Sequence, residues 1–487
     1  MSAESTVKVP SLLHALLCFG GNFLMISLGL FVFKLSLHVI LFFCLLWTAI
    51  QAWLLNYNFI AIRAMMSAGI AHALPAIYIF ILIGMVIAAF MQSGSVAALI
   101  YHGLNLLTPA TFLVAGLVLC SLMSVATGTS WGSAGTLGVV LIGIGSAMAI
   151  PLPLVAGMIV CGATFGDKLS PISDTTNLAA MSANTNLFSH IGSMLYTTVP
   201  AFIVTLLIFA ALGLQFSANA LPVGEIAALQ MALSDSYQLG LAITLLPLLV
   251  MLILSLRRVS AEISMSASIL TAVAVAVLYQ DRNLLDVLNS LWSNQPGTTG
   301  IESLDDLLGR GGMMSMSWTL LLSLMALALG GILFQAGFLQ ALLEGLIARI
   351  RSTTQLIATT IGAGIVGNMG MGEAYISIIL NCQLFRKAYE ERGLDNAVLS
   401  RSVEEGSTMS TGLIPWTTAG AFYAVTLGVP VLDYAPYAFL NYLNPLISIA
   451  MAAMGIGLLG KASKNLTSPA LDDLCVLEFS SDKSPDS

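Results

Sequence analysis

Charged residues are scarce in this sequence. Asp, Glu, Lys and Arg make up only 8% of its 487 residues, whereas soluble domains average about 25%. Hydrophobic residues make up 57%, and the mean hydropathy is +0.93. This composition excludes an ordinary soluble domain. It predicts an all-α polytopic protein that is embedded in the lipid bilayer.

Cysteine and histidine are also few, with six and five residues respectively. They are scattered without metal-ligand spacing, which excludes a recognisable metal motif. Residues 162–168 resemble a phosphate-binding loop only loosely, because the glycine spacing is one residue short. Neither polar cluster described below contains a histidine to activate a nucleophile. We therefore expect no enzyme, no cofactor, no bound nucleotide and no nucleic acid partner.

The most unusual stretch is Gly166–Asn177, which carries Asp167, Lys168 and Asp174 between two apolar runs. A charge in the bilayer core costs about 2.5–3.5 kcal/mol on insertion scales, so it persists only where it faces a cavity or a partner. Pro171 removes a backbone donor from this stretch. We predict a helix over 151–182 that breaks in mid-membrane and turns its oxygens toward an ion. The alternative is a cytoplasmic loop.

Two further apolar stretches are interrupted by polar tips. The first covers 110–148 with its tip at Thr127–Gly132, and the second covers 353–389 with its tip at Gly367–Glu373. Each arm is shorter than the roughly 20 apolar residues needed to cross a bilayer. The pattern predicts two re-entrant helical hairpins, whose tips must be buried in protein or line a cavity.

The second half of the chain repeats the order of the first. We predict about 10 spans and 2 hairpins, arranged as repeats 12–214 and 238–460 around a periplasmic linker at 215–237, with a disordered cytoplasmic tail at 461–487. The expected segments are spans near 12–33, 38–55, 74–92, 196–214, 238–256, 262–280, 315–334 and 435–460, interfacial helices at 94–107 and 335–351, and broken helices at 151–182 and 394–428. At one nearly constant offset, Gly128 pairs with Gly370 and Thr175 with Thr417.

The odd number of crossings in each half predicts that the repeats are inverted. If the N-terminus is cytoplasmic, most Lys and Arg residues fall on the cytoplasmic side, as the positive-inside rule requires. Both termini are then cytoplasmic, and we expect a multi-pass protein of the inner membrane. Inverted repeats with interrupted segments at matching positions are typical of a secondary transporter with its site at the midplane.

The second broken helix carries adjacent carboxylates, Glu404 and Glu405. They cannot both stay ionised in an apolar run without a cation, and neighbours on a helix point about 100° apart. We expect one to face the site and the other to meet Arg401 or an interface. A carboxylate that holds either a proton or Na⁺ makes the two ions compete, and hard oxygen donors suit Na⁺.

Several alternatives concern single residues. Asp174 either binds an ion or caps the following half-helix, and Glu373 either reaches the midplane or caps the second arm. We predict a Na⁺ site at Asp174 and the helix-break hydroxyls. The ion- or substrate-binding candidates are Asp167, Ser173, Asp174, Thr175, Thr176, Asn177, Thr127, Thr129, Ser130, Glu373, Glu404, Glu405, Ser407, Thr408, Thr411 and Thr417. The structural or coupling candidates are Lys168, Pro171, Gly128, Gly370 and Pro415.

Residues Gly166–Asn177 are similar to the signature of NhaC-type Na⁺/H⁺ antiporters, and Thr127–Thr136 and Glu404–Trp416 look like two further motifs of that family. The resemblance implies membership of the ion transporter superfamily and a homodimer built from scaffold and moving transport domains. It also implies exchange of Na⁺ for H⁺ by alternating access. The alternative is a Na⁺- or H⁺-coupled carrier of a small organic acid, of the malate/lactate type, or an amino acid.

This chain departs from the family pattern at three places. Thr417 stands where Asn is frequent, and Glu373 where Asp is common. Asn381-Cys382-Gln383 replaces a Pro-Gly pair followed by a basic residue. The missing basic residue favours a bare ion over an anionic cargo.

Overall fold

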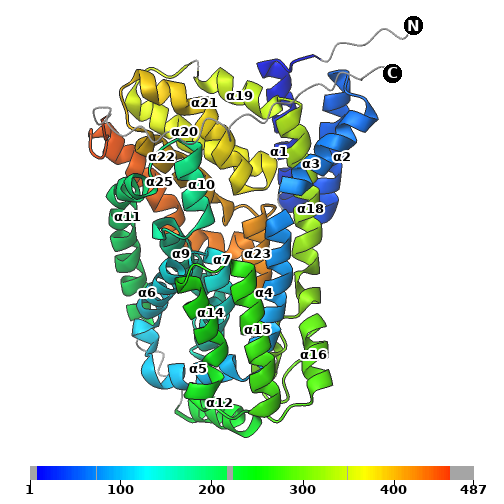
Figure 1. Ribbon diagram of the computed structural model, residues 1–487, viewed down its shortest axis with the longest axis vertical. Helices are drawn as coiled ribbons and strands as arrows, with labels where there is room; N and C mark the ends of the chain where they lie inside the picture. The colour runs from blue at the N-terminus through cyan, green and yellow to red at the C-terminus, as the bar shows by residue number, and fades with distance from the viewer. Residues whose placement is uncertain (1–7, 73, 217–222, 348, 461–487) are drawn as a thin grey trace.

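The computed structural model describes residues 8–72, 74–216, 223–347 and 349–460, and these are overwhelmingly helical (Figure 1). Within them, eight helices are long and apolar enough to cross a membrane, or nine if one bent pair counts as a single span. The all-α polytopic fold is therefore confirmed. The predicted tail 461–487 lies outside the described residues.

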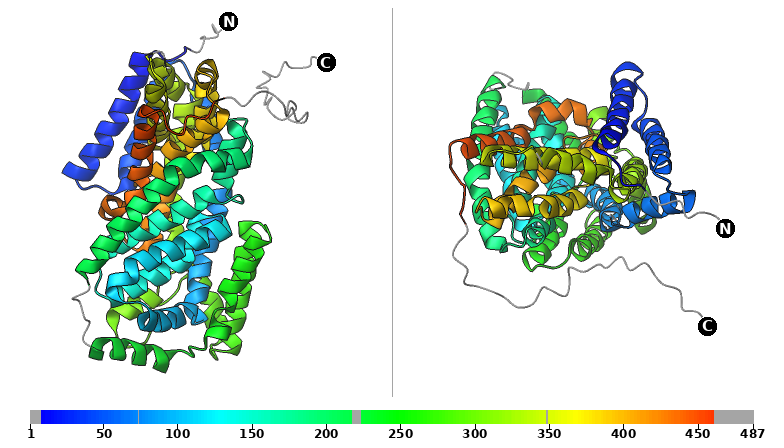
Figure 2. Two further views of the ribbon diagram at one scale, coloured as in Figure 1. Left: turned by 90° about the vertical axis from the view of Figure 1, so that its left-hand side faces the viewer. Right: turned by 90° about the horizontal axis from the view of Figure 1, so that it is seen from above.

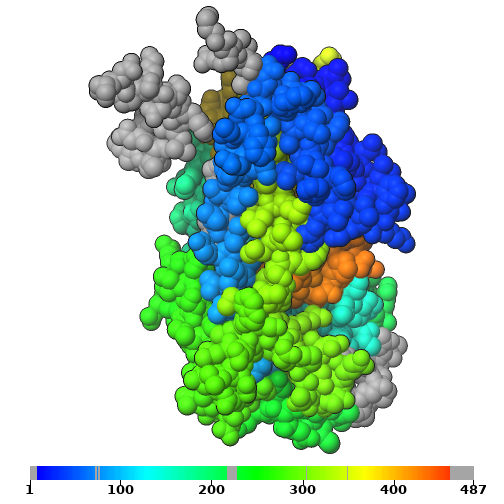
Figure 3. Space-filling model, turned by 90° about the vertical axis from the view of Figure 1, so that its right-hand side faces the viewer, coloured from blue at the N-terminus to red at the C-terminus, as the bar shows by residue number. Residues whose placement is uncertain are grey.

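The first three helices are α1 (Leu12–Ser27, continued by a π-helical turn), α2 (Leu37–Leu54) and α3 (Phe59–His72). The sequence pattern did not predict α3. It packs with α2 against α18 (Ser317–Gln335), which lies more than 200 residues later in the chain (Figure 3). Small residues allow the close approach, because a Cβ on Gly69 would lie 2.8 Å from Cα of Gly331.

The first predicted hairpin consists of α6 (Pro109–Thr127) and a second arm that begins with α7 (Ser130–Ser133) and ends with α8 (Val139–Ala147). Its arms are 19 and 18 residues long, and both are long and apolar enough to cross a membrane. The expectation that these arms are too short to cross is wrong, and the re-entrant path stays a prediction. Gly128, with φ of +66°, ends α6, and the Thr129 side chain caps α7.

The second hairpin consists of α20 (Thr353–Met371) and α21 (Ala374–Glu391). It turns in the same way, with Gly372 at φ of +68° followed by Glu373, whose side chain caps α21. The glycine that matches Gly128 in position is therefore Gly372. Gly370 lies inside α20, where an added Cβ would be 2.7 Å from the Phe19 ring.

Both predicted helix breaks are present. The first separates α9 (Leu152–Leu169) from α10 (Asp174–Ser182), and the second separates α22 (Asn396–Thr411) from α23 (Thr418–Leu427). In Figure 1, the chain rises from α9 to α10 but descends from α22 to α23. The two broken helices thus run in opposite directions, which an inverted repeat requires.

The remaining helices complete the fold. They are α4 (Leu74–Gln92), α5 (Ser95–Leu106), α11 (Leu187–Gln215), α12 (Val223–Ser236), α13 (Leu241–Thr244), α14 (Leu246–Leu256), α15 (Ala261–Leu278), α16 (Leu284–Trp292), α17 (Glu302–Leu308), α19 (Phe338–Ile347), α24 (Val431–Tyr434) and α25 (Phe439–Ala453). The predicted linker at 215–237 thus contains a helix, α12, in its described part. Helices α5, α12 and α16 lie at the end of the molecule opposite α19 (Figure 1 and Figure 2). Large apolar side chains are exposed along α1, α2, α11 and α15, as expected of surfaces that face lipid.

Candidate functional site

A small cavity lies where both hairpin tips meet both helix breaks. Its volume is about 50 Å³, enough for a few water-sized groups at roughly 10–15 Å³ each. Carboxylates, hydroxyls and aromatic rings from the two halves of the chain surround it. The lining residues are Ile79, Thr129, Ser130, Trp131, Thr164, Asp167, Asp174, Thr175, Glu373, Ala374, Tyr375, Thr408, Thr411, Gly412, Thr418, Ala419 and Tyr423.

Three carboxylates line this cavity at different depths. Asp167 and Glu373 are buried, with 6% and 3% of their surface exposed, whereas Asp174 is exposed to solvent. The Tyr375 hydroxyl donates a 2.8 Å hydrogen bond to Oδ2 of Asp174. This bond joins the break of α9–α10 to the tip of the second hairpin.

The local sequence at the first break explains why Asp174 is available to the cavity. Ser173 is the helix cap, because its Oγ accepts from the Thr176 N–H at 3.4 Å. The Asn177 side-chain amide donates to the carbonyl oxygens of Pro171 (3.0 Å) and Ser173 (2.7 Å). Asp174 is thus the first residue of α10 rather than its cap, and the helix N-terminus there favours its negative charge.

Glu373 has both of the roles considered for it. Its Oε1 accepts from the backbone N–H groups of Ala374 (2.8 Å) and Tyr375 (3.3 Å) and so caps α21. Its Oε2 accepts from the Thr418 hydroxyl at 2.6 Å. The carboxylate therefore holds the second hairpin tip against the start of α23 while it lines the cavity.

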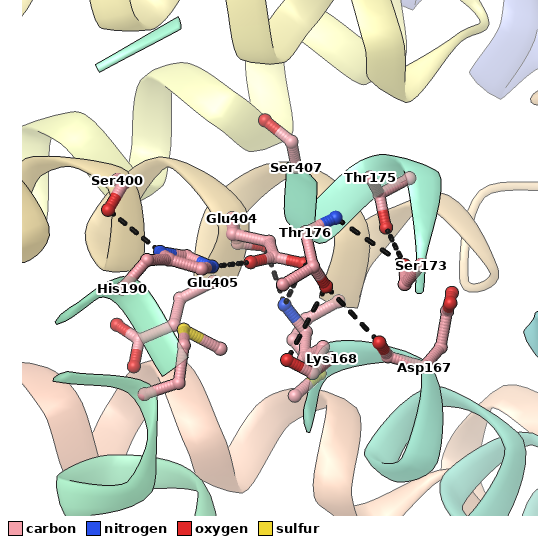
Figure 4. Close-up of polar contacts among 12 residues, drawn as sticks. Asp167, Lys168, Ser173, Thr175, Thr176, His190, Ser400, Glu404, Glu405 and Ser407 are labelled. Atoms are coloured by element: carbon pink, nitrogen blue, oxygen red, sulfur yellow. Dashed lines mark hydrogen bonds and ion pairs between the residues drawn. The ribbon is translucent and has the colours of Figure 1, made fainter. Parts of the chain in front are cut away.

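Glu404 belongs to a separate buried network (Figure 4). Its Oε2 lies 2.6 Å from Nε2 of His190, whose Nδ1 lies 2.7 Å from the Ser400 hydroxyl. The Lys168 ammonium lies 3.9 Å from Oε1 of Glu404 and donates to the Glu404 carbonyl oxygen at 3.0 Å. Thr176 Oγ1 is 3.4 Å from the same carboxylate. Lys168 thus pairs with Glu404 across the two broken helices.

Glu405 points to another side of α22. Its Oε1 accepts from the Thr197 hydroxyl of α11 at 2.5 Å. Arg401 donates to the carbonyl oxygens of Ser193 (3.3 Å) and Gly457 (3.1 Å). Neither Glu404 nor Glu405 is among the residues that line the cavity.

The structure divides the sequence candidates into two sets. The candidates that line the cavity are Asp167, Asp174, Thr175, Thr129, Ser130, Glu373, Thr408 and Thr411. The candidates outside the lining are Ser173, Thr176, Asn177, Thr127, Glu404, Glu405, Ser407 and Thr417, which bond to the surrounding chain. Several candidates outside the lining form hydrogen bonds that cap or stabilise the helices at the two breaks. Thr417, for example, caps α23 by accepting from the Gly420 N–H at 3.1 Å.

Several polar residues of the site were not predicted. Thr164, Tyr375, Thr418 and Tyr423 line the cavity, and His190 bonds to Glu404. One signal could have found His190. It shares a helix face with Ser193 and Thr197 at spacings of three and four residues, which forms a polar stripe in an apolar helix.

The possible ligands in the cavity wall are carboxylate and hydroxyl oxygens, which are hard donors and suit an alkali cation. In the described part of the chain, no three His, Cys, Asp or Glu side chains are grouped around one possible metal position. A cation in this cavity would therefore complete its coordination with hydroxyls, carbonyls or water. Partly buried carboxylates can also accept protons, so the same cavity can hold either ion.

Comparison with known proteins agrees with this chemistry. The model of the Na⁺/H⁺ antiporter family matches residues 5–176 and 162–456. The chain is similar to the Na⁺/H⁺ antiporter NhaC of Alkalihalophilus pseudofirmus, with 37% identity over 91% of this chain and 95% of the relative. It is similar to NhaC of Bacillus subtilis, with 35% identity over 87% and 96%. It also resembles the malate-2H⁺/Na⁺-lactate antiporter of Bacillus subtilis, with 32% identity over 90% and 93%. The chain belongs to the Na⁺/H⁺ antiporter family.

Proposed function

We propose that this protein exchanges Na⁺ for H⁺ across the cytoplasmic membrane by alternating access. The observation that carries the proposal is the cavity at which both hairpin tips and both helix breaks meet, with Asp167, Asp174 and Glu373 in its wall. Helix ends at a broken span provide dipoles for ions at membrane depth. The two similar antiporters named NhaC support the choice of ions.

Competition for the same carboxylates would couple the two ions. With the carboxylates ionised, their oxygens and the nearby hydroxyls of Thr129 and Thr411 bind Na⁺. Protonation removes the charge that attracts the cation, so Na⁺ leaves. Asp174 is exposed and Asp167 is buried, so Asp174 would receive the ion first from the side to which the cavity opens in this structure.

Contacts between the broken helices indicate which parts would move together. Lys168 and Thr176 bind Glu404, and Tyr375 binds Asp174. These bonds, of which those to Glu404 are buried, join α9, α10, α21 and α22 into one unit. We propose that this unit, with its inverted halves, is the transport domain. Cytoplasmic termini, the inner-membrane location and a homodimer complete the proposal.

Everted vesicles with an imposed pH gradient test the exchange. Adding Na⁺ should dissipate the gradient for the wild type and not for Asp174→Asn. Asp433→Asn is a matched control, because Asp433 is exposed on α24 and does not line the cavity. It should behave like the wild type.

The same vesicles decide between a bare ion and an organic cargo. If Na⁺ alone has no effect but Na⁺ with malate, lactate or amino acids does, the protein is a solute carrier. A cavity of about 50 Å³ favours a cation over a dicarboxylate. If Asp174→Asn exchanges like the wild type, the proposed site is wrong.

A further inference from the structure

A second group of buried polar side chains lies between α11, α22 and α25, apart from the cavity. Its members are Thr197, Glu405, Asn441, Asn444 and Ser448, which we call the Glu405 cluster, and each is at most 3% exposed. None of them lines the cavity described above. Asn441, Asn444 and Ser448 share one face of α25 because their spacings are three and four residues.

Contacts at three levels set the register of α25 against α22. The Asn441 side-chain amide donates to the Met409 carbonyl at 2.8 Å, Ser448 lies beside the Glu405 carboxylate, and Arg401 donates to the Gly457 carbonyl. The helices are therefore antiparallel. Asn444 lies between the first two of these contacts along α25.

The cluster holds unpaired acceptors together with the unpaired amide donors of Asn444. Oε2 of Glu405, Oδ1 of Asn441 and both polar side-chain atoms of Asn444 have no hydrogen-bond partner, and the Ser448 hydroxyl lies beside the Glu405 carboxylate. Pro445 lies inside α25 and has no N–H, so the Asn441 carbonyl also lacks its helical donor. Leaving one buried polar group unpaired costs about 1–3 kcal/mol. The unpaired oxygens of Glu405, Asn441 and Asn444 are of the kind that bind a hard cation.

In the described residues no side-chain cation forms an ion pair with Glu405, although the charge of Arg401, one turn earlier on α22, acts on its carboxylate. The Arg401 guanidinium bonds to carbonyl oxygens of Ser193 and Gly457 and forms no ion pair with Glu405. Lys168 and His190 are paired with Glu404 on the other side of α22.

We propose that the Glu405 cluster is a second binding site for an alkali cation such as Na⁺. Its ligands are Oε2 of Glu405, Oδ1 of Asn444 and Oγ of Ser448. The Asn441 oxygens belong to the same cluster but are not assigned as ligands. Carboxylate, amide and hydroxyl oxygens are the donors that hard cations prefer. The proposal extends the proposed exchange, because each chain would then hold two cations, but binding at this site does not depend on transport.

Equilibrium binding of ²²Na⁺ to the purified full-length protein tests the site. The wild type should bind two Na⁺ per chain. Asn444→Ala should lose one of them, and Asp174→Asn should lose the other. Asn105→Ala is the control, because Asn105 is exposed on α5, and it should bind two. If Asn444→Ala binds as many ions as the wild type, the cluster holds water only and the proposal is wrong.

Two further variants keep the test decisive if Asn444→Ala does not fold. Ser448→Ala removes one ligand oxygen with little change in shape and should weaken one of the two Na⁺ affinities about tenfold, the equivalent of roughly 1.4 kcal/mol. Asn444→Asp keeps an oxygen donor and should bind two ions. Unchanged affinities in Ser448→Ala would overturn the proposal. If the cavity is not a Na⁺ site, Asp174→Asn will bind and exchange Na⁺ like the wild type. That outcome is independent of the result for the Glu405 cluster.

Discussion

The Lys168 ammonium donates a 3.0 Å hydrogen bond to the main-chain carbonyl oxygen of Glu404. Both side chains are fully buried, and they come from the two broken helices of opposite halves. The buried Lys168 charge of α9 is thereby stabilised by a carbonyl oxygen of α22. The contact explains how Lys168 and Glu404 persist in apolar segments, since each is a partner of the other.

Lys168→Met should destabilise the protein strongly. Removing one partner of a buried ion pair costs about 3–5 kcal/mol, and the Glu404 carboxylate would keep its contact with His190 but lose the Lys168 charge. The double variant Lys168→Met/Glu404→Gln should recover part of that loss. Thermal unfolding in detergent measures both effects as a double-mutant cycle.

An exposed pair provides the matched control. Lys387 and Glu391 lie 3.9 Å apart with most of their side chains exposed, and such pairs contribute about 0–1 kcal/mol. Lys387→Met should leave the unfolding temperature nearly unchanged. Equal losses in the buried and exposed variants would contradict the assigned role of Lys168.

Glu373→Gln should distinguish the two roles of this side chain, capping of α21 and negative charge in the cavity. The glutamine oxygen can still accept from the Ala374 N–H, so stability should change little, whereas the cavity loses a negative charge. We expect Na⁺-driven dissipation of a pH gradient to fall at least tenfold. Glu373→Ala should in addition lose about 1 kcal/mol of stability with the cap. Full exchange in Glu373→Gln would restrict Glu373 to a structural role.

The parts of the fold that could be predicted from sequence are those with a local signal. Charges and Pro171 in an apolar run indicate a broken helix, and the Gly128-Thr129 tip interrupts another. The polar stripe of α11 marks His190 as a candidate, but no local signal pairs it with Glu404, which is 214 residues away along the chain. Only packing of α11 against α22 brings them together. The predicted pairing of Gly128 with Gly370 is two residues off, because the glycine with the matching positive φ is Gly372.

Gly128→Ala should disturb the first hairpin tip. Its φ is +66°, and an added Cβ would lie 2.5 Å from Cγ1 and 2.9 Å from the backbone carbon of Ile172. The left-handed conformation alone costs about 1–2 kcal/mol for a residue with a side chain. We expect a lower unfolding temperature and weaker exchange. Gly192→Ala is the control, because nothing lies within 4 Å of its Cβ position, and helix propensity should make it neutral or slightly stabilising.

The loop before α18 should open in acid. Oδ1 of Asp305 accepts from the Thr299 hydroxyl (2.7 Å) and N–H (2.6 Å), and Oδ2 accepts from the Gly300 N–H (3.1 Å). These bonds, the Thr299 hydroxyl first, hold the pKa of Asp305 below its ordinary value. A carboxylate with a lowered pKa stabilises the folded loop fully above its ordinary pKa of about 3.9. That stabilisation is lost as the pH falls through the folded-state value.

Asp305→Asn imitates the protonated state at neutral pH, so trypsin should cleave after Arg310 faster in this variant than in the wild type. Asp306→Asn changes the same charge on the exposed neighbouring residue and should be cleaved at the wild-type rate. If the two variants are cleaved equally fast, loss of charge in the loop, rather than the Thr299 bonds, controls its opening. Because no residue of 293–316 lines the cavity, Na⁺ exchange by Asp305→Asn should stay within twofold of the wild type.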